Sequence, residues 1–442
     1  MKDFAALVSA FAWRVFGNSG QVENLQQLTG GANMESWSFD YAGRGYVLRR
    51  SPSAEMMAGR TYGHDIEAAV VRAAFAAGVK APEIVGEIEA VDNLGTGYLM
   101  RRVEAEVNPT IILANPPPSL LDDFARALAA VHAVPIGDLP ILPEAGAATL
   151  LSELKSRFLS YGGDRPVMAL TLKWLEDNLP AAVEPVLLHG DFRIGNLMVN
   201  ADGLAAVLDW ELAHLGDRHQ DLAFGCINSW RFGHIDRPAF GIGPLDIFFA
   251  AYSRESGVTI EPDRFRWWLV YATLWWGVCC LQMADIWRSG LDQSLERAVI
   301  GRRASETEVD LLMLLEEAAP VEELGLVTLK TPQLFPRNGE PSVLELLEAL
   351  SGWIQTDIRP NAQGRDRFMS AVALNALGML QREAGAPIHI QDKLLSEELL
   401  AGNQSLATPG LLAKLKVKSL QKLAADQPKY SALAVAQRKW TQ

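Results

Sequence analysis

The sequence is poor in cysteine and in positive charge, and both shortages exclude classes of protein. Its 442 residues include three cysteines, Cys226, Cys279 and Cys280, which form no CxxC pair and no even-numbered framework. This usage favours buried thiols in a reducing compartment over disulfides or a zinc site, so we expect a cytoplasmic protein. The formal net charge of −13 argues against general nucleic-acid binding, which needs a basic surface.

Long hydrophobic runs are also scarce, with one exception. The N-terminal stretch MKDFAALVSAFAWRVFG carries Asp3 early and is only partly apolar, so it predicts an amphipathic helix rather than a signal peptide. Residues 267–284 contain no charge over 18 positions, which is the lower limit of a membrane span. Their tryptophans are spread through the run instead of forming belts at its ends, and Thr273 and Gln282 interrupt it. We therefore expect a buried core helix and no membrane contact.

The apolar content is sufficient for more than one core. Apolar residues make up 49% of the chain and charged residues 21%, which is ordinary for a large globular protein. Residues 25–103 combine short runs broken by glycine with a helical stretch at 64–77, which predicts strands around one long helix. From about residue 119 the apolar spacing is mostly helical, apart from strand-like runs in 186–208. Proline and glycine gather in 319–340, as in a linker.

These patterns predict an α+β protein in three parts. A β-rich lobe occupies residues 1–103, a mostly helical lobe 104–325, and an all-α domain 335–442. The last part carries no catalytic constellation, so we expect it to serve in packing, in dimerisation or as a lid over substrate. Its arginines suit helix capping better than an anion contact: Arg359, Arg365 and Arg367.

Polar side chains lie at both ends of one predicted hairpin, in HGDFRIGNLMVNADGLAAVLDWE. The pair Asp202-Gly203 is a strong signal for a two-residue turn. A turn centred there sets Asn196 opposite Asp209, with Cα atoms roughly 4.5–5.5 Å apart. An amide oxygen beside a carboxylate suits Mg²⁺, which takes its remaining ligands from water and substrate phosphates. We expect the two side-chain oxygens to converge on one ion-sized space.

Asp191 lies in the loop before this hairpin, five residues ahead of Asn196. This spacing brings its carboxylate to the edge of the predicted metal site without making it a ligand. That is the place of a base, or of a group that orients an incoming hydroxyl. Turn capping is the alternative explanation for these acids, and it suits Asp202 best.

Three motifs, in this order, resemble one enzyme family. HGDFRIGN (189–196) is similar to the HGDxxxxN loop of the aminoglycoside phosphotransferase and choline kinase superfamily, a relative of the protein kinases. LDWE (208–211) resembles the metal-binding element of that family, and GDRHQDLA (216–223) resembles its GDPxxDLA segment. The resemblance extends over roughly residues 25–290. It implies a two-lobed protein-kinase-like fold, with an antiparallel N-terminal lobe and a helical second lobe.

The resemblance also implies roles for the matched residues. Asp191 would be the catalytic base, Asn196 and Asp209 would hold Mg²⁺, and ATP would donate the phosphoryl group. Hydrogen bonds that support the loop are implied for His189, Asp217 and Asp221. Asp217 is equally suited to cap a helix N-terminus.

The nucleotide side departs from the family pattern at its basic residue. The family pairs a strand lysine on the phosphates with a helix glutamate; here the matching positions are Arg49, in GYVLRR, and Glu67. Arginine stays charged and contacts phosphate bidentately, so it suits this role. The kinase modules fused to acyl-CoA dehydrogenases, which this sequence resembles best, also carry a VLR-type strand. Further implied nucleotide contacts are Gly30, Gly31 and Asn33 in LTGGANMESWSF, and Met100, Arg101 and Val103 in YLMRRV.

Each of these nucleotide-side positions has a structural alternative. Glu67 fits an exposed helix acid, the glycine loop fits a plain hairpin turn, and YLMRRV fits an ordinary connector between lobes. The acceptor is indicated only by aromatic and basic residues around and after LDWE, which as a set favour an apolar or anionic alcohol over a cationic antibiotic. Proposed substrate contacts are Arg193, Glu211, Trp230 and Arg231. The dehydrogenase-fused modules point to a hydroxyacyl-CoA or a hydroxy acid.

The sequence thus predicts an ATP- and Mg²⁺-dependent phosphotransferase that acts on a small-molecule hydroxyl and forms a homodimer through its C-terminal helices. Two alternatives remain open. The arginine at position 49 and the degenerate glycine loop suggest a nucleotide-binding scaffold without catalysis. A metal-dependent hydrolase is the other alternative, with the side chains of His189, Asp191, Asp209 and His214, but it leaves the glycine-containing strand lobe unexplained.

Overall fold

The structure, a computed structural model, describes residues 2–17, 20–28, 34–53, 57, 60–329, 343–383 and 392–441. The chain folds into two compact units. Unit 1 comprises residues 1–146, 182–232 and 236–265, and unit 2 comprises residues 147–181, 233–235 and 266–442.

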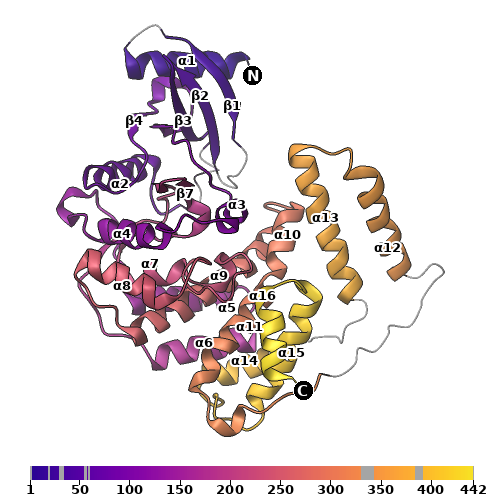
Figure 1. The fold of residues 1–442 in the computed structure, drawn as a ribbon. Helices are drawn as coiled ribbons and strands as arrows, with labels where there is room; N and C mark the ends of the chain where they lie inside the picture. The colour runs from indigo at the N-terminus through magenta and orange to yellow at the C-terminus, as the bar shows by residue number, and fades with distance from the viewer. Residues whose placement is uncertain are drawn as a thin grey trace. The chain divides into compact units, whose positions relative to one another are not determined.

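Unit 1 begins with an antiparallel sheet (Figure 1), whose five strands pair in the order β1-β2-β3-β5-β4. Its strands are β1 (Val22–Gln27), β2 (Glu35–Tyr41), β3 (Arg44–Ser51), β4 (Ile84–Glu87) and β5 (Thr96–Arg101). Helix α1 (Lys2–Phe16) packs against the sheet, where Phe11 is fully buried with Phe39 and Leu48. Helix α2 (His64–Ala76) contacts β4 and β5, and Gly78, with a φ of 88°, follows it. The predicted β-rich lobe with one long helix is confirmed.

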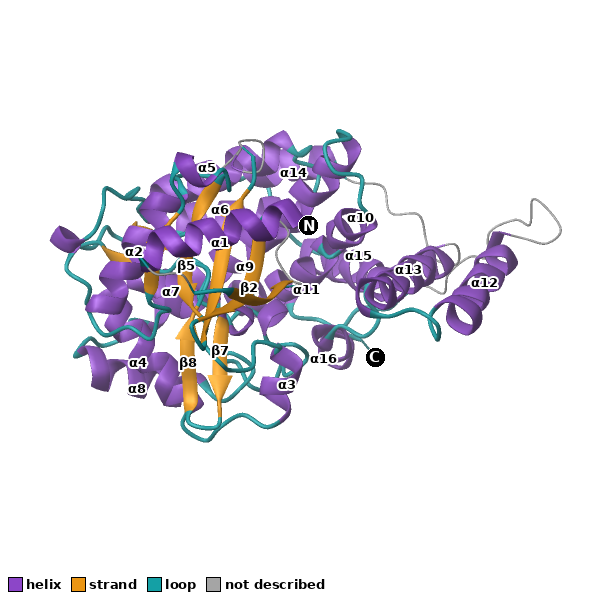
Figure 2. Cartoon of the chain, turned by 90° about the horizontal axis from the view of Figure 1, so that it is seen from above, coloured by secondary structure: helices purple, strands orange, loops and turns teal. Residues whose placement is uncertain are grey.

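The rest of unit 1 carries two short two-stranded sheets between helices. Strand β6 (Val186–Leu188) pairs with β9 (His214–Gly216), and β7 (Leu197–Asn200) pairs with β8 (Gly203–Val207), as Figure 2 shows for the second pair. The remaining described helices of this unit are α3 (Pro109–Ala114), α4 (Leu120–His132), α7 (Arg218–Phe224) and α8 (Leu245–Ser256). Helices α4 and α8 pack against each other.

Unit 2 is helical in the part that the structure describes. Its helices are α5 (Ala147–Ser160), α6 (Pro166–Asp177), α9 (Pro262–Arg288, from residue 266), α10 (Leu295–Arg302), α11 (Ala304–Leu315), α12 (Val343–Trp353), α13 (Gly364–Glu383), α14 (Lys393–Leu400), α15 (Leu411–Asp426) and α16 (Ser431–Trp440). A π-helical turn at Ile354–Ile358 follows α12.

Helix α9 contains the uncharged run of the sequence. By length and composition it could cross a membrane, but 61% of its most apolar window is buried inside the protein, and the core helix of a soluble protein passes the same test. Trp267, Trp268 and Val270 are almost completely buried, and the Trp267 indole N–H donates to the Leu175 carbonyl at 3.0 Å. This burial agrees with the predicted core helix.

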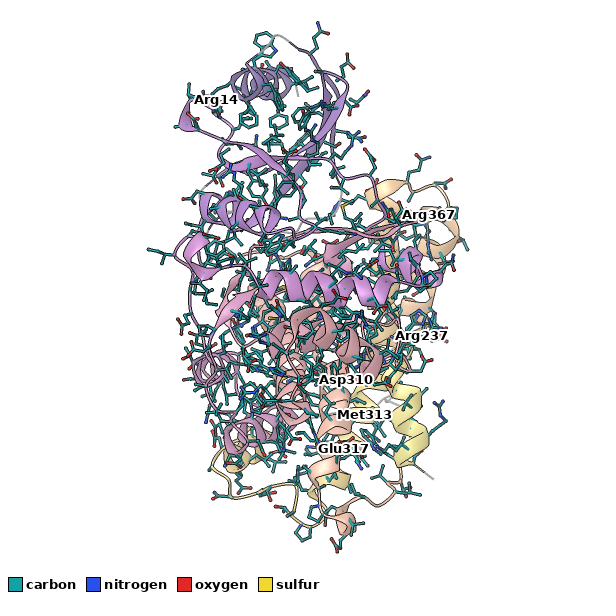
Figure 3. The ribbon with its side chains drawn as sticks, turned by 60° about the vertical axis from the view of Figure 1, so that its left-hand side comes forward. Arg14, Arg237, Asp310, Met313, Glu317 and Arg367 are labelled. Atoms are coloured by element: carbon teal, nitrogen blue, oxygen red, sulfur yellow. The ribbon has the colours of Figure 1, made fainter. Side chains whose placement is uncertain are left out.

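Buried acids on α11 and the short turn after it bind side chains from the C-terminal helices. The Lys422 ammonium lies 3.1 Å from the Glu308 carboxylate, and the Tyr430 hydroxyl donates to Asp310, which Figure 3 labels, at 2.5 Å. Glu316 accepts from the Trp440 indole N–H at 2.8 Å. Helices α14 to α16 therefore share one core with α6 and α11. The predicted domain limits at residues 103, 325 and 335 remain predictions.

Truncation of Trp440 tests how much the last helix contributes to unit 2. The side chain is 2% exposed and joins packing to the Glu316 hydrogen bond, so Trp440→Ala should lower the free energy of unfolding by about 3–5 kcal/mol. Urea titration measures this change. Trp287→Ala is the matched control, because that indole is 39% exposed and its loss should cost less than about 1 kcal/mol. Equal losses would contradict the shared core.

Candidate active site

The β7–β8 hairpin turns one residue earlier than the sequence predicts. Asn200 pairs with Gly203, so the turn residues are Ala201 and Asp202. The Asn200 side-chain oxygen accepts the Asp202 backbone N–H at 2.9 Å and closes the turn. Gly203, with a φ of 110°, begins the return strand beside the Asp123 carboxylate, which a Cβ at this position would meet at 2.0 Å. The glycine thus permits close approach to α4 rather than forming the turn.

The earlier turn also changes the residue opposite Asn196. A bulge leaves one extra residue, Ala205, on β8, and beyond it the Leu208 N–H donates to the Asn196 carbonyl at 2.8 Å. The prediction that Asn196 stands opposite Asp209 is therefore wrong by one residue: the earlier turn shifts the partner by two residues, and the bulge restores one of them. Asp209 follows with a φ of 65°, which is uncommon for a residue other than glycine.

Asp191 is held by side chains from both sides of its carboxylate. The Arg193 Nε donates to Oδ1 at 2.9 Å, and the Asn196 Nδ2 donates to Oδ2 at 2.6 Å. Burial raises the pKa of Asp191 to about 6, against the lowering effect of Arg193, and the charge of Asp209 raises it further. Asn196 and Asp191 are thus brought together, with the Asn196 nitrogen directed toward Asp191, while Asp209 is close enough for its charge to act on Asp191. The predicted convergence of the Asn196 and Asp209 oxygens remains a prediction.

The loop that carries Asp191 is fixed by a buried carboxylate. Asp221 accepts the backbone N–H of His189 at 2.7 Å and that of Gly190 at 2.8 Å. His132, whose Nδ1 lies 2.7 Å from the Tyr252 hydroxyl, lies 3.4 Å from the same carboxylate through Nε2. Although burial alone would raise it, the pKa of Asp221 is lowered by His132 and by the backbone donors.

His189 and Asp217 occupy different positions around this loop. His189 Nδ1 accepts the Asp191 N–H at 3.2 Å, and its Nε2 lies 2.9 Å from the Leu208 carbonyl. Burial lowers the pKa of His189, which favours the neutral ring. Asp217 caps α7 by accepting the His219 N–H at 3.0 Å, and it also binds Arg264 at 2.8 Å.

Two arginines of the N-terminal lobe enter the site, and the sequence analysis missed one of them. Arg49 pairs with Asp209, while its nearest approach to Glu67 is 3.7 Å. Glu67 instead accepts from Arg60 at 2.7 Å and from the Tyr98 hydroxyl at 2.8 Å. The only signal for Arg60 was that it is the one basic residue between β3 and α2.

Arg60 also reaches the acid that follows the LDW stretch. Its Nη1 donates to Glu211 at 2.8 Å. One guanidinium therefore joins Glu67 of α2 to Glu211, which follows β8 in the chain. Burial raises the pKa of Glu211, and the neighbouring charge of Asp209 adds to this rise. Together with Arg49, these groups form a cluster of three carboxylates and two guanidiniums, which leaves an excess of one negative charge. Among the described residues, no group of three or more His, Cys, Asp or Glu side chains is arranged to hold a metal ion.

The other predicted positions make the following contacts. The Arg193 guanidinium lies 4.7 Å from the Trp230 ring centre, beside Asp191. Arg231 donates to the Cys226 carbonyl at 2.9 Å. Met100 pairs with Val47 in the sheet, and Arg101 lies over the Tyr46 ring at 5.3 Å. Val103 follows β5. Three predicted nucleotide contacts lie outside the described residues: Gly30, Gly31 and Asn33.

Comparison with known proteins identifies the class to which this chain belongs. Residues 24–268 match the phosphotransferase enzyme family, and because this is more than half of the chain, the protein belongs to that family. A Ralstonia eutropha protein assigned as an aminoglycoside phosphotransferase is 20% identical, with a TM-score of 0.56, over 71% of this chain and 98% of that one. This likeness shows the fold, and the predicted two-lobed kinase-like fold is confirmed.

The curated relatives are dehydrogenase-linked proteins, as the sequence predicted. Acyl-CoA dehydrogenase family member 10 of Mus musculus is 26% identical over 280 residues, 58% of this chain and 26% of that protein. Acyl-CoA dehydrogenase family member 11 of Gallus gallus is 29% identical over 213 residues, 46% of this chain and 27% of that protein. The chain thus spans only about a quarter of the length of these relatives.

The raised pKa of Asp191 predicts a measurable effect on stability. An unfolded aspartate titrates near pH 4, so between pH 4 and 6 the folded state keeps a proton that the unfolded state has released. Folding stability therefore loses this contribution as pH rises. Asp191→Asn removes the loss, and its stability relative to the native chain should rise by up to about 3 kcal/mol between pH 4 and pH 8. Urea unfolding at both pH values measures this.

Asp202→Asn is the control for this experiment, since Asp202 lies exposed in the hairpin turn. Its stability difference from the native chain should stay flat with pH. A flat difference for Asp191→Asn as well would mean that the pKa of Asp191 is not raised.

Proposed function

We propose that this chain transfers the γ-phosphoryl group of ATP to a hydroxyl of a small molecule, with the help of Mg²⁺. The observation that carries the proposal is the Asp191 carboxylate, largely buried and held at both oxygens in a member of the phosphotransferase family. A carboxylate with a pKa of about 6 is ionised near neutral pH and basic enough to take a proton from a hydroxyl as it attacks.

The residues around Asp191 fit a magnesium ion. Asp209 offers a carboxylate and Asn196 an amide oxygen, which are the hard ligands that Mg²⁺ prefers. Magnesium commonly keeps waters and substrate phosphates as its other ligands, so two protein ligands suffice. The ion would neutralise charge on the transferred phosphoryl group. The excess negative charge of the cluster supports this assignment.

Arg49 and Arg60 together take the two roles of the single family lysine, which are to contact the phosphates and to pair with the helix glutamate. Arg60 holds Glu67 and Glu211, which leaves Arg49 to contact nucleotide phosphates beside Asp209. A guanidinium can bind two phosphate oxygens at once. The glycine loop, with Gly30, Gly31 and Asn33, and the stretch from Met100 to Val103 remain proposed contacts for the nucleotide.

The acceptor is proposed to be an anionic alcohol, such as a hydroxyacyl-CoA or a hydroxy acid. Two observations support it. Arg193 contacts both Asp191 and the Trp230 ring, so a cationic and an aromatic side chain adjoin the proposed base. The curated relatives named above are acyl-CoA dehydrogenase family members. Glu211 and Arg231 remain further proposed contacts, although Arg231 already binds a backbone carbonyl.

The hydrolase alternative finds no support in the geometry. Both ring nitrogens of His189 already have hydrogen-bond partners. His214 lies 2.8 Å from the Leu212 carbonyl through one nitrogen and 3.3 Å from Gln220 through the other. Neither ring is thus presented to a metal ion shared with Asp191. Measurement of ATP turnover distinguishes a phosphotransferase from the other alternative, a nucleotide-binding scaffold without catalysis.

Asp191→Asn should lower ADP release, measured over a panel of hydroxyacyl-CoAs and hydroxy acids, by about 10²–10⁴-fold. Binding of a fluorescent ATP analogue should change little, because Asp191 acts on the acceptor. For the native chain, kcat/KM should rise with pH through about pH 6, as Asp191 loses its proton. A native chain that binds ATP and turns over no acceptor would favour the scaffold.

Arg60→Met should raise the KM for MgATP by about tenfold, an effect of about 1.4 kcal/mol. The physical reason is that Glu67 and Glu211 would then compete with phosphate for Arg49. Arg60→Lys should restore part of the affinity. The matched control is Arg50→Met, whose guanidinium pairs with Glu35 at 3.3 Å. Equal KM values for the Arg60→Met and Arg50→Met variants would refute the division of work between the two arginines.

A further inference from the structure

Met34 is the first described residue after the glycine loop, and its sulfur contacts both arginines of the nucleotide side. The Arg49 Nε donates to the Met34 Sδ at 3.2 Å, and the Arg60 Nη1 donates to the same atom at 3.0 Å. The methionine is only 8% exposed. A thioether sulfur is a weak and neutral acceptor, so one buried, uncharged atom receives hydrogen bonds from two cations.

The register of the sheet explains how Met34 reaches Arg49. In the pairing of β2 with β3, Ser36 stands opposite Arg49. Met34 immediately precedes β2, two residues before Ser36, and side chains two residues apart in an extended strand point to the same face. Met34 is therefore a diagonal neighbour of Arg49, at a separation that long side chains can span. Arg60 comes from the segment between β3 and α2.

Two roles are compatible with a buried methionine at this place. One is to fill space, because the flexible thioether side chain fits irregular gaps. The other is to accept hydrogen bonds. The surroundings favour the second role, since the side chains of Arg49 and Arg60 are only 14% and 11% exposed. A donor that is largely buried and lacks an acceptor is costly, and Met34 supplies an acceptor to both.

The neutrality of the sulfur matters beside a phosphate site. The neighbouring cluster already sets three carboxylates against two guanidiniums, and a further acid would repel phosphate. Asp209 holds Arg49 at Nη2 and Met34 holds it at Nε, so two contacts orient this guanidinium. Without the sulfur, Arg49 would be freer to turn toward Glu67 or Glu211, which lie 3.7 and 3.9 Å away. Those carboxylates would then compete with the nucleotide.

We infer that Met34 is a positioning residue for the nucleotide. Its thioether sulfur holds Arg49 and Arg60 in the orientation in which Arg49 meets the phosphates. The inference rests on the proposed function, because it assigns Met34 a part in the nucleotide binding proposed there. Met34 acts through the two arginines, as an acceptor and not as an apolar side chain.

Two substitutions of Met34 separate the two roles. Met34→Leu keeps the volume and removes the acceptor, so the Kd for a fluorescent ATP analogue should rise about fivefold. Met34→Gln has a similar length and offers an amide oxygen to the guanidiniums, so its Kd should stay within about twofold of the native value. A space-filling role predicts the opposite order, because leucine suits an apolar site and a buried amide without partners does not.

Met283→Leu is the matched control for these binding measurements. The Arg297 Nη1 donates to the Met283 sulfur at 2.6 Å in unit 2, so this variant loses the same kind of contact outside unit 1. Its Kd should equal that of the native chain. Native affinity in Met34→Leu, or weaker binding by Met34→Gln than by Met34→Leu, would overturn the inference.

A double-mutant cycle tests the sulfur contact without nucleotide. Met34→Leu and Arg60→Met should each raise the unfolding constant in urea. The effect of Met34→Leu should be at least about threefold smaller when Arg60 is already replaced, since the pair interacts directly. Independent effects of the two substitutions would overturn the role of the sulfur. A native chain that binds no nucleotide would contradict the proposed function, and this cycle would still decide whether Met34 holds Arg60.

Discussion

The candidate site depends on one buried carboxylate. Asp221 is fully buried and accepts two successive backbone N–H groups, those of His189 and Gly190. Such charge-assisted bonds are strong away from water, and they set the direction of the loop just before Asp191. His132 approaches the same carboxylate and supplies part of its compensation. Without Asp221, two successive backbone N–H groups just before the proposed base would lose their acceptor.

A second constraint is the balance of charge between the two parts of the site. Three carboxylates and two guanidiniums meet where β3 and α2 face the segment after β8. Arg49 cannot satisfy Glu67, Asp209 and Glu211 together, because its approaches to Glu67 and Glu211 are 3.7 and 3.9 Å. Arg60 supplies the missing positive charge at 2.7 and 2.8 Å. Arg49, at the position of the family lysine, therefore acts together with Arg60. Substitution of either arginine alters the surroundings of the other.

The sequence predicted what depends on local spacing and missed what depends on contacts across the fold. The loop from His189 to Asn196 and the long helix after β3 follow from motif and periodicity. The partner of Asn196 does not, because the Asn200 side chain and the bulge at Ala205 moved the turn and the register. Arg60 is 151 positions from Glu211, and no pattern in the sequence relates two residues at that separation. Site geometry of this kind needs the folded chain.

The helices in the last hundred residues differ in their contacts with the rest of unit 2. Helices α15 and α16 bring Lys416, Lys422 and Trp440 to buried acids of α11 and the turn that follows it. Removal of one of these partners would leave a carboxylate buried without a compensating charge or hydrogen bond, which strongly destabilises the fold. Helix α12 instead packs against α13, where Gln381 donates to Ser351 at 3.3 Å, and several of its apolar side chains are about half exposed. Burial against α11 therefore explains why the last two helices are part of unit 2.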